Sequence, residues 1–250
     1  MKQNSLHVLS YNIHKGFSTT RRHFVLKEMK HSLDQVHPDL VFLQEVLGRH
    51  EKHDRRIAGH DDLSQLEYLA GHMWSHMAYG KNAVYTAGHH GNAILSKHPI
   101  AGSDNLDVST SRLQKRGFLH ARIAVPGRKE PLHAICLHLD LFESGRRLQV
   151  NELCQRIKKA VPPDAPLIVA GDFNDWRGKI SSVLQDRLEL DEVFQSFHGE
   201  HARTFPSLKP VLRLDRIYIR GLKIKNAVVL NQGLLNRLSD HAAILAELTF

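Results

Sequence analysis

The sequence predicts a single α/β domain, on three observations. Short apolar runs bounded by turn-forming residues recur along the chain, and residues 167–170 (Leu-Ile-Val-Ala) are the clearest of them, as expected for a strand buried on both faces. Longer amphipathic segments lie between several of these runs and predict helices. No Gly/Ser-rich or Pro-rich linker and no internal repeat divides the 250 residues, so one domain spanning residues 1–250 is expected.

In chain order, apolar runs and apolar/polar alternation predict strands at 6–11, 39–45, 91–96, 118–125, 132–137, 167–170, 214–219 and within 239–248. Helical spacing of apolar residues predicts helices at 24–36, 63–73, 144–161 and 180–190. In the third helix Leu148, Leu153 and Ile157 are expected to face inward, and Arg146 and Arg147 outward. The polar segment 48–62, dense in Arg, His and Asp, is expected to be a loop and is a candidate lid.

The composition permits a sizeable core and favours anionic partners. Hydrophobic residues make up 42% of the chain and charged residues 24%, and the net charge is +8. This excess favours phosphodiesters, nucleic acid or acidic lipid without choosing among them. The first residues lack a signal-type apolar segment and no apolar run is long enough to cross a bilayer, so a cytoplasmic protein is expected. Cys136 and Cys154 fall on an expected strand and helix, which favours reduced thiols.

The strand at 167–170 leads directly into candidate functional residues. Gly171 permits a sharp turn, and Asp172 and Asn174 follow, so a carboxylate and an amide sit at the strand's tip. Such a pair can share a water or a metal ion. Taken alone, the same residues are more typical of an Asp/Asn-rich turn that caps the next helix.

Polar groups at the ends of other strands favour the functional interpretation. Four of these groups stand where an expected strand ends: Asn12, Glu45, His138 and Asp172. Three others stand where an expected strand begins: Asp215, Asp240 and His241. If the two sets of strands run antiparallel, all seven side chains meet at one rim of the sheets. Seven strand ends that carry only Asn, Glu, His and Asp are hard to attribute to turn chemistry.

Six motifs in order resemble those of the endonuclease/exonuclease/phosphatase superfamily of metal-dependent phosphoesterases. They are Tyr11-Asn12, Leu43-Gln44-Glu45, His138-Leu139-Asp140, Gly171-Asp172-Phe173-Asn174, Asp215-Arg216-Ile217 and Ser239-Asp240-His241. The resemblance spans almost the whole chain. It implies a four-layer α-β-β-α sandwich of two mixed sheets flanked by helices.

The resemblance also implies a role for each matched residue. Glu45 would be the principal ligand of Mg²⁺, or of Mn²⁺, with Asn12 and Asp240 near the ion, and hard oxygen ligands suit these metals. Asp172 would deprotonate the attacking water, which Asn174 positions. His241 would donate to the phosphoryl oxygens while Asp215 holds its ring, and His138 would be a second phosphate donor. Direct in-line attack by water then needs no covalent intermediate.

The same motifs favour one substrate class. DNA-repair members of the superfamily typically carry an Asn soon after the first motif, a Lys after the metal-binding Glu and a Tyr-containing loop at the third motif. The corresponding features of this chain are His14-Lys15-Gly16, Val46 and His138. The chain looks more like the sphingomyelinase, inositol-phosphatase and cardiolipin-associated branches, so a lipid or small-molecule phosphoester is favoured. A nuclease acting on DNA or RNA, and a catalytically inactive binding module with the same fold, are the alternatives.

Some expectations concern groups outside the motifs. Lys15 and Arg116 are candidates for binding additional phosphate, although solvated basic loops explain them equally well. Trp74, Phe142 and Trp176 are either an apolar wall for the substrate or core residues, and core packing is the commoner fate. The basic surface is compatible with peripheral membrane contact, but the sequence contains no amphipathic anchor helix and specifies no oligomeric state.

Overall fold

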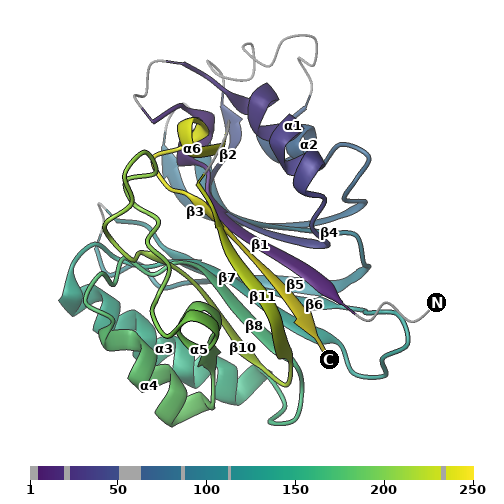
Figure 1. Cartoon of the computed structure of the whole chain (residues 1–250), viewed down its shortest axis with the longest axis vertical. Helices are drawn as coiled ribbons and strands as arrows, with labels where there is room; N and C mark the ends of the chain where they lie inside the picture. The colour runs from purple at the N-terminus through teal and green to yellow at the C-terminus, as the bar shows by residue number, and fades with distance from the viewer. Residues whose placement is uncertain (1–4, 20–22, 51–62, 86–87, 112–113, 232–234) are drawn as a thin grey trace.

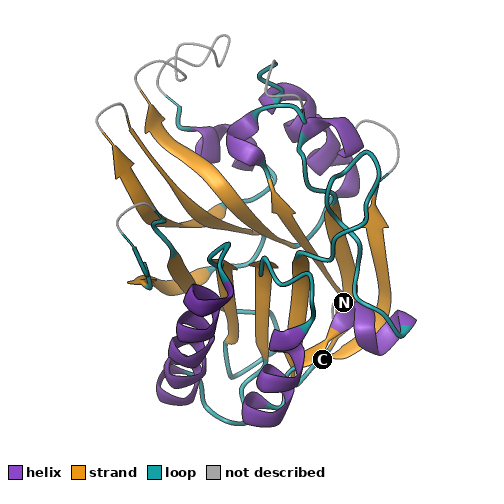
Figure 2. Ribbon diagram, turned by 90° about the vertical axis from the view of Figure 1, so that its left-hand side faces the viewer, coloured by secondary structure: helices purple, strands orange, loops and turns teal. Residues whose placement is uncertain are grey.

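Two six-stranded mixed sheets pack face to face, and helices cover the outer side of each (Figures 1 and 2). This computed structural model describes residues 5–19, 23–50, 63–85, 88–111, 114–231 and 235–250. The layers follow the expected α-β-β-α order. In Figure 1, α1 and α2 lie on one outer side of the paired sheets and α3 and α4 on the other.

The first sheet has the order β11-β12-β1-β2-β4-β3. Its strands are β1 (Leu6–Asn12), β2 (Leu40–His50), β3 (His76–Tyr85), β4 (Gly88–Ser96), β11 (Lys223–Leu230) and β12 (Ala243–Thr249). The second sheet has the order β5-β6-β7-β8-β10-β9. Its strands are β5 (Ile100–Asp107), β6 (Gly117–Ile123), β7 (Leu132–His138), β8 (Leu167–Asp172), β9 (Asp191–Glu192) and β10 (Asp215–Arg220).

The helices connect and cover these strands. They are η1 (His14–Gly16), α1 (Leu26–Val36), α2 (Gln65–Ala70), α3 (Glu143–Ala160), α4 (Lys179–Leu188), α5 (Val193–His198) and α6 (Leu235–Leu238). Within the described part of the chain, no helix is both long enough and apolar enough to span a membrane. Cys136 and Cys154 are buried free thiols, as predicted.

Three apolar layers hold the sandwich together because side chains of a strand alternate between its two faces. On β8, Ile168 and Ala170 point into the core between the sheets, whereas Leu167 and Val169 pack beneath α3 and α4. A third core lies between the first sheet and α1 and α2. Every residue of β8 is buried, which confirms the prediction of a strand covered on both faces.

Edge positions explain the strands that the sequence did not reveal. β3, β5 and β11 lie at sheet edges, and β5 and β11 leave many of their residues exposed. Their sequences therefore lack the continuous apolar runs by which the buried strands were predicted. The helix expected at 63–73 is shorter in the structure, where α2 spans Gln65–Ala70.

The face of α3 differs from the prediction. Leu148 is 60% exposed, whereas Arg146 is 5% exposed and lies on the buried face with Val150 and Leu153. These three buried positions follow the four- and three-residue spacing of one helix face, from which Leu148 is turned away. Arg146 is accommodated because its guanidinium donates to backbone carbonyls of the loop before the helix.

Candidate active site

The strand ends predicted to converge do so at one rim. β1 and β2 run parallel with Asn12 opposite Gln44, while β12 runs antiparallel to β1 and begins beside its end. In the second sheet, Asp172 pairs with His138 on one side and with Asp215 on the other. Contacts between β1 and both β8 and β10 bring the two rims together.

Two unusual backbone conformations shape the tip of β8. Gly171 has φ +148°, and a Cβ there would lie 1.9 Å from the carbonyl oxygen of Leu137, so only glycine lets β7 approach this closely. Asn174 has φ 50°, a left-handed conformation that Asn tolerates. Its backbone N–H donates to Asp172 Oδ1 at 2.9 Å, and its side chain donates to the carbonyl of Leu139 at 3.0 Å.

Asp172 lies at the centre of the site. Its Oδ2 accepts a hydrogen bond from Asn12 Nδ2 at 3.2 Å and lies 3.4 Å from His138 Nε2 and 3.7 Å from His241 Nε2. Burial raises the pKa of Asp172 well above its usual range; the neighbouring His241 opposes the shift and Asp215 reinforces it. The carboxyl is therefore suited to accepting a proton near neutral pH.

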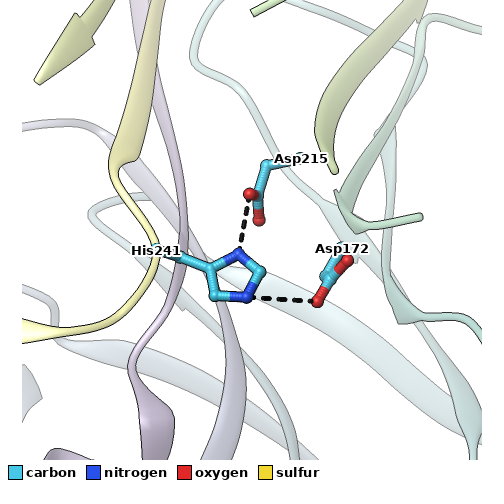
Figure 3. Close-up of side chains that lie close together, drawn as sticks. All are labelled: Asp172, Asp215 and His241. Atoms are coloured by element: carbon cyan, nitrogen blue, oxygen red, sulfur yellow. Dashed lines mark hydrogen bonds and ion pairs between the residues drawn. The ribbon is translucent and has the colours of Figure 1, made fainter. Parts of the chain in front are cut away.

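The imidazole of His241 lies between two carboxyl groups (Figure 3). Its Nδ1 lies 2.9 Å from Oδ2 of Asp215, which is completely buried. Burial alone would lower the pKa of His241, but the attraction of Asp215 and then of Asp172 raises it well above its usual value. The ring is therefore held as an imidazolium with its Nε2–H toward the site.

Glu45 reaches the rim from the middle of its strand. The prediction that the strand ends at Glu45 was wrong, because β2 continues to His50. The pairing with β4 is irregular between Leu43 and Val46, and Glu45 has φ 57°. Such a bulge re-aims one side chain without ending the strand. Glu45 is close enough to Arg116 and His90 to raise the pKa of each, against the lowering effect of burial.

The segment that carries Asp240 and His241 is anchored to the end of β1. Ser239 Oγ donates to the carbonyl of Asn12 at 2.6 Å, and the Oδ1 of Asn12 accepts from the backbone N–H of His14 at 3.1 Å. Asp240 Oδ1 then lies 3.5 Å from His14 Nδ1. A short chain of contacts thus links Asn12 through His14 to Asp240, and links Asn12 directly to Asp172 of the other sheet.

The sequence profile described as the Endonuclease/Exonuclease/phosphatase family matches residues 9–241. The chain belongs to this family. The YbhP protein of Escherichia coli strain K12 is 44% identical to it over 247 residues, which cover 99% of this chain and 97% of YbhP. A UPF0294 protein of Vibrio campbellii is 22% identical over 250 residues, 99% of this chain and 79% of that protein.

Solved structures show the same fold. A family member from Beutenbergia cavernae superposes with a TM-score of 0.77 at 17% identity, over 99% of this chain and 72% of that one. The TDP2 protein of D. rerio, in complex with a single-strand DNA product, gives a TM-score of 0.74 at 22% identity, over 98% of this chain and 99% of its own. None of these names tests the expected likeness to the sphingomyelinase branch, which stays a prediction.

The candidate site contains two histidines that were not among the predicted site residues. His14 is buried beside Asp240. His90 of β4 lies close enough to Glu45, Lys15 and Arg116 for their charges to shift its pKa. Burial, followed by Lys15, lowers the pKa of His90 to about 4, so this ring is neutral. The only sequence signal for His14 is its place two residues after Asn12, while His90 is brought in by strand pairing.

The two predicted basic residues also lie at this rim. Arg116 Nε donates to the carbonyl of Leu139 at 3.1 Å, and the carboxylates of Asp172, Glu45 and Asp140 act on its charge. Lys15 has φ 59° and is one of the charges that lower the pKa of His138, after burial and Arg116. Residues 51–62 of the expected loop lie outside the described residues.

The three aromatic residues expected either in the core or in an apolar wall for the substrate do not all lie in the core. Trp74 is a core residue, fully buried with its Nε1–H donating to the carbonyl of Pro38 at 3.1 Å. Phe142 and Trp176 are 67% and 48% exposed, so core packing is the wrong interpretation for them. Asp140, which belongs to one motif, accepts from the backbone N–H of Phe142 at 2.9 Å and so shapes the loop instead of entering the site.

The residues present fit a divalent cation in their donor chemistry. Asp172, Asp215 and His241 each offer a ligand atom within 4.8 Å of the others. However, an imidazolium at His241 already supplies a positive charge between these carboxylates, which disfavours a metal ion there. Glu45, Asn12 and Asp240 offer hard oxygen atoms from the first sheet, which is the donor type that Mg²⁺ prefers.

Proposed function

We propose that the chain is a divalent-metal-dependent phosphoesterase in which Asp172 activates the attacking water. The observation that carries the proposal is the buried position of this carboxylate, with its pKa raised by burial and with Asn12, His138 and His241 around one oxygen. The N–H of Asn174 fixes the other oxygen. A base so oriented can take the proton of a water placed in line with the leaving group.

The two histidines serve the phosphoryl group in different ways. His241 is held cationic by Asp215 and Asp172, so it donates a charge-assisted hydrogen bond to an oxygen that gains charge in the transition state. The pKa of His138 is lowered by burial and by Arg116, so this ring is neutral and donates through a single N–H. Removal of Asp215 would release the imidazole from its tautomer and orientation.

Glu45, Asn12 and Asp240 would hold Mg²⁺ or Mn²⁺. When bound, such an ion neutralises phosphate charge and stabilises the leaving oxygen. Glu45 is well suited to this role because the bulge in β2 turns a strand residue toward the rim. Asn12 contributes twice, since its amide N–H₂ also donates to Asp172.

A lipid or small-molecule phosphoester is the favoured substrate, on the basis of His14-Lys15, Val46 and His138 in place of the residues typical of DNA-repair members. A nuclease is the second candidate. It is supported by the net charge of +8 and by the fold shared with D. rerio TDP2, whose structure holds a single-strand DNA product. The intact set of acids and histidines argues against an inactive binding module.

A substrate panel with variants tests the proposal. Purified protein is assayed with bis(p-nitrophenyl) phosphate, phospholipids, DNA and RNA in the presence of Mg²⁺, Mn²⁺ or Ca²⁺. We expect Asp172→Asn to lower kcat by roughly 10³-fold, as loss of a general base does, with an unchanged unfolding midpoint. His241→Ala is expected to be similarly impaired. Near wild-type rates in either variant would contradict the assigned roles, and failure on every ester would favour a binding module.

A further inference from the structure

The rim around the candidate site carries exposed apolar side chains that neither the core nor the proposed chemistry uses. We call this group the apolar lip; it consists of Leu141, Phe142, Trp176, Leu208 and Val211, which are 54%, 67%, 48%, 57% and 55% exposed. Among the described residues, the lip contains half of all large hydrophobic side chains that are exposed. Such a concentration at one place on a surface indicates an interaction site.

The loops that carry the lip are tied to one another beside the active site. The first two loops follow β7 and β8, and they are joined by the bond from Asn174 Nδ2 to the carbonyl of Leu139. The third loop precedes β10. Arg216 joins it to the second, because its guanidinium donates to the carbonyls of both Asp175 and Arg213. The lip is therefore part of the rim onto which the site opens.

The exposed side chains are presented by ordered backbone. The buried guanidinium of Arg146 donates to the carbonyl oxygens of Leu141 at 2.6 Å and of Asp140 at 3.1 Å. Asp140 in turn accepts from the N–H of Phe142. These contacts hold Leu141 and Phe142 outward, so a partner that covers them meets a preorganised surface.

Positive charge lies beside the lip, on the side of Trp176 and the groove between α3 and α4. The guanidinium carbons of Arg146 and Arg177 lie 5.7 and 5.8 Å from the ring centre of Trp176. Below the lip, a groove of about 330 Å³ between α3 and α4 is lined by Arg146, Arg147, Lys179 and Arg187. Its acids are Asp175 and Glu143, and the latter is paired with Lys179 at 2.7 Å. The cations therefore outnumber the acids at this place.

We propose that the apolar lip inserts into the surface of a membrane containing anionic phospholipid, while the exposed cations of the groove, Arg147, Lys179 and Arg187, bind lipid headgroups. Apolar protrusions flanked by Arg and Lys are typical of interfacial binding. Single-stranded nucleic acid would stack on Phe142 and Trp176, but the aliphatic Leu141, Leu208 and Val211 offer no face for stacking. Their exposure is explained by contact with acyl chains. The inference rests on the proposed function only in that a membrane would deliver the ester to Asp172.

Sedimentation with vesicles tests the surface directly. The whole chain is mixed with vesicles of phosphatidylcholine alone, or of phosphatidylcholine with phosphatidylglycerol. We expect binding to the anionic vesicles, weakened by salt. The double variant Phe142→Ser/Trp176→Ser is expected to partition at least about tenfold more weakly, because it removes two insertable side chains. The matched control is Phe197→Ser, which removes an exposed aromatic ring on α5 and should bind as the wild type does.

Two further measurements separate insertion from a structural effect. The chain has two tryptophans, and because Trp74 is fully buried, a blue shift of emission on adding vesicles reports Trp176. Arg147→Glu and Arg177→Glu should each weaken binding to anionic vesicles by about fivefold or more and leave binding to phosphatidylcholine unchanged. Unfolding midpoints of all variants are compared to exclude misfolding.

The outcomes distinguish this inference from the proposed function. Asp172→Asn should bind vesicles as the wild type does while its kcat falls by roughly 10³-fold. Vesicle binding by a wild-type protein that hydrolyses no ester would refute the phosphoesterase assignment and leave the inferred surface intact. Absence of vesicle binding, unchanged Trp176 emission, or equal binding by the double variant would overturn the inference. Binding of a single-stranded oligonucleotide instead, lost in the same double variant, would assign the lip to nucleic acid.

Discussion

Replacing Gly171 by Ala should damage both stability and the site, because this glycine sets the distance between β7 and β8. The added Cβ would lie 1.9 Å from the carbonyl oxygen of Leu137, so the strands must separate by roughly 1 Å, at a cost of about 1–3 kcal/mol for overpacking. Its φ of +148° adds about 1–3 kcal/mol for a residue with a side chain. The expected loss of unfolding free energy is therefore about 4 kcal/mol.

Gly127→Ala is the matched control for the conformational part of this loss. Gly127 also has positive φ, +78°, but an added Cβ would meet nothing within 4 Å. Its cost should be about 1–2 kcal/mol. Urea unfolding followed by circular dichroism measures both variants. Equal losses within about 0.5 kcal/mol would refute the steric argument. Since His138 and Asp172 are paired across these strands, Gly171→Ala should also lower kcat in the fraction that remains folded.

Three other predictions concern metal binding, the core and acid stability. Glu45→Gln should raise the Mg²⁺ concentration for half-maximal activity by at least about tenfold, because the ion loses a carboxylate ligand. A calorimetric Mg²⁺ affinity equal to that of the wild type would contradict the role of Glu45 as a ligand. Trp74→Phe should lower the unfolding free energy by about 1–3 kcal/mol, because the buried carbonyl of Pro38 loses its donor; the urea midpoint measures this, with Phe197→Ser as an exposed control. Burial, followed by His133, lowers the pKa of His120 from 6.5 to about 4 in the folded protein. The stabilisation that comes from keeping His120 neutral should therefore be fully present above pH 6.5 and be lost as the pH falls toward 4, because the unfolded chain binds the proton more readily. The loss should be roughly 1 kcal/mol at pH 5 and should be smaller in His120→Phe, and identical pH profiles would exclude this cause.

The sequence predicted those parts of the site that follow continuous buried runs. Asn12, His138 and Asp172 end strands that are almost wholly buried, and most residues of such strands are apolar, so their polar ends are conspicuous. Asp215 and His241 were found for the complementary reason, since each stands at or just before the beginning of such a strand.

The remaining features depend on tertiary structure. The bulge at Glu45 puts a glutamate into a left-handed conformation, for which its local sequence carries no signal. His90 joins the site only because β4 pairs with β2. Arg146 was expected outward because a charged residue is rarely buried without partners, and its partners are carbonyls of a loop whose path the sequence does not reveal. Edge strands such as β5 are too exposed to show an apolar pattern.

The candidate site is divided between the two sheets, and this division links the core to the chemistry. The first sheet carries the proposed metal ligands Asn12, Glu45 and Asp240 together with His241, whereas the second carries His138, Asp172 and Asp215. Three contacts of the site cross between them: Asn12 to Asp172 at 3.2 Å, His241 to Asp215 at 2.9 Å, and His241 to Asp172 at 3.7 Å. Because the apolar layer between the sheets fixes their separation, it also fixes the distance from the metal ligands to the base. The geometry of the candidate site therefore depends on packing in the inter-sheet core as directly as on the residues at the rim.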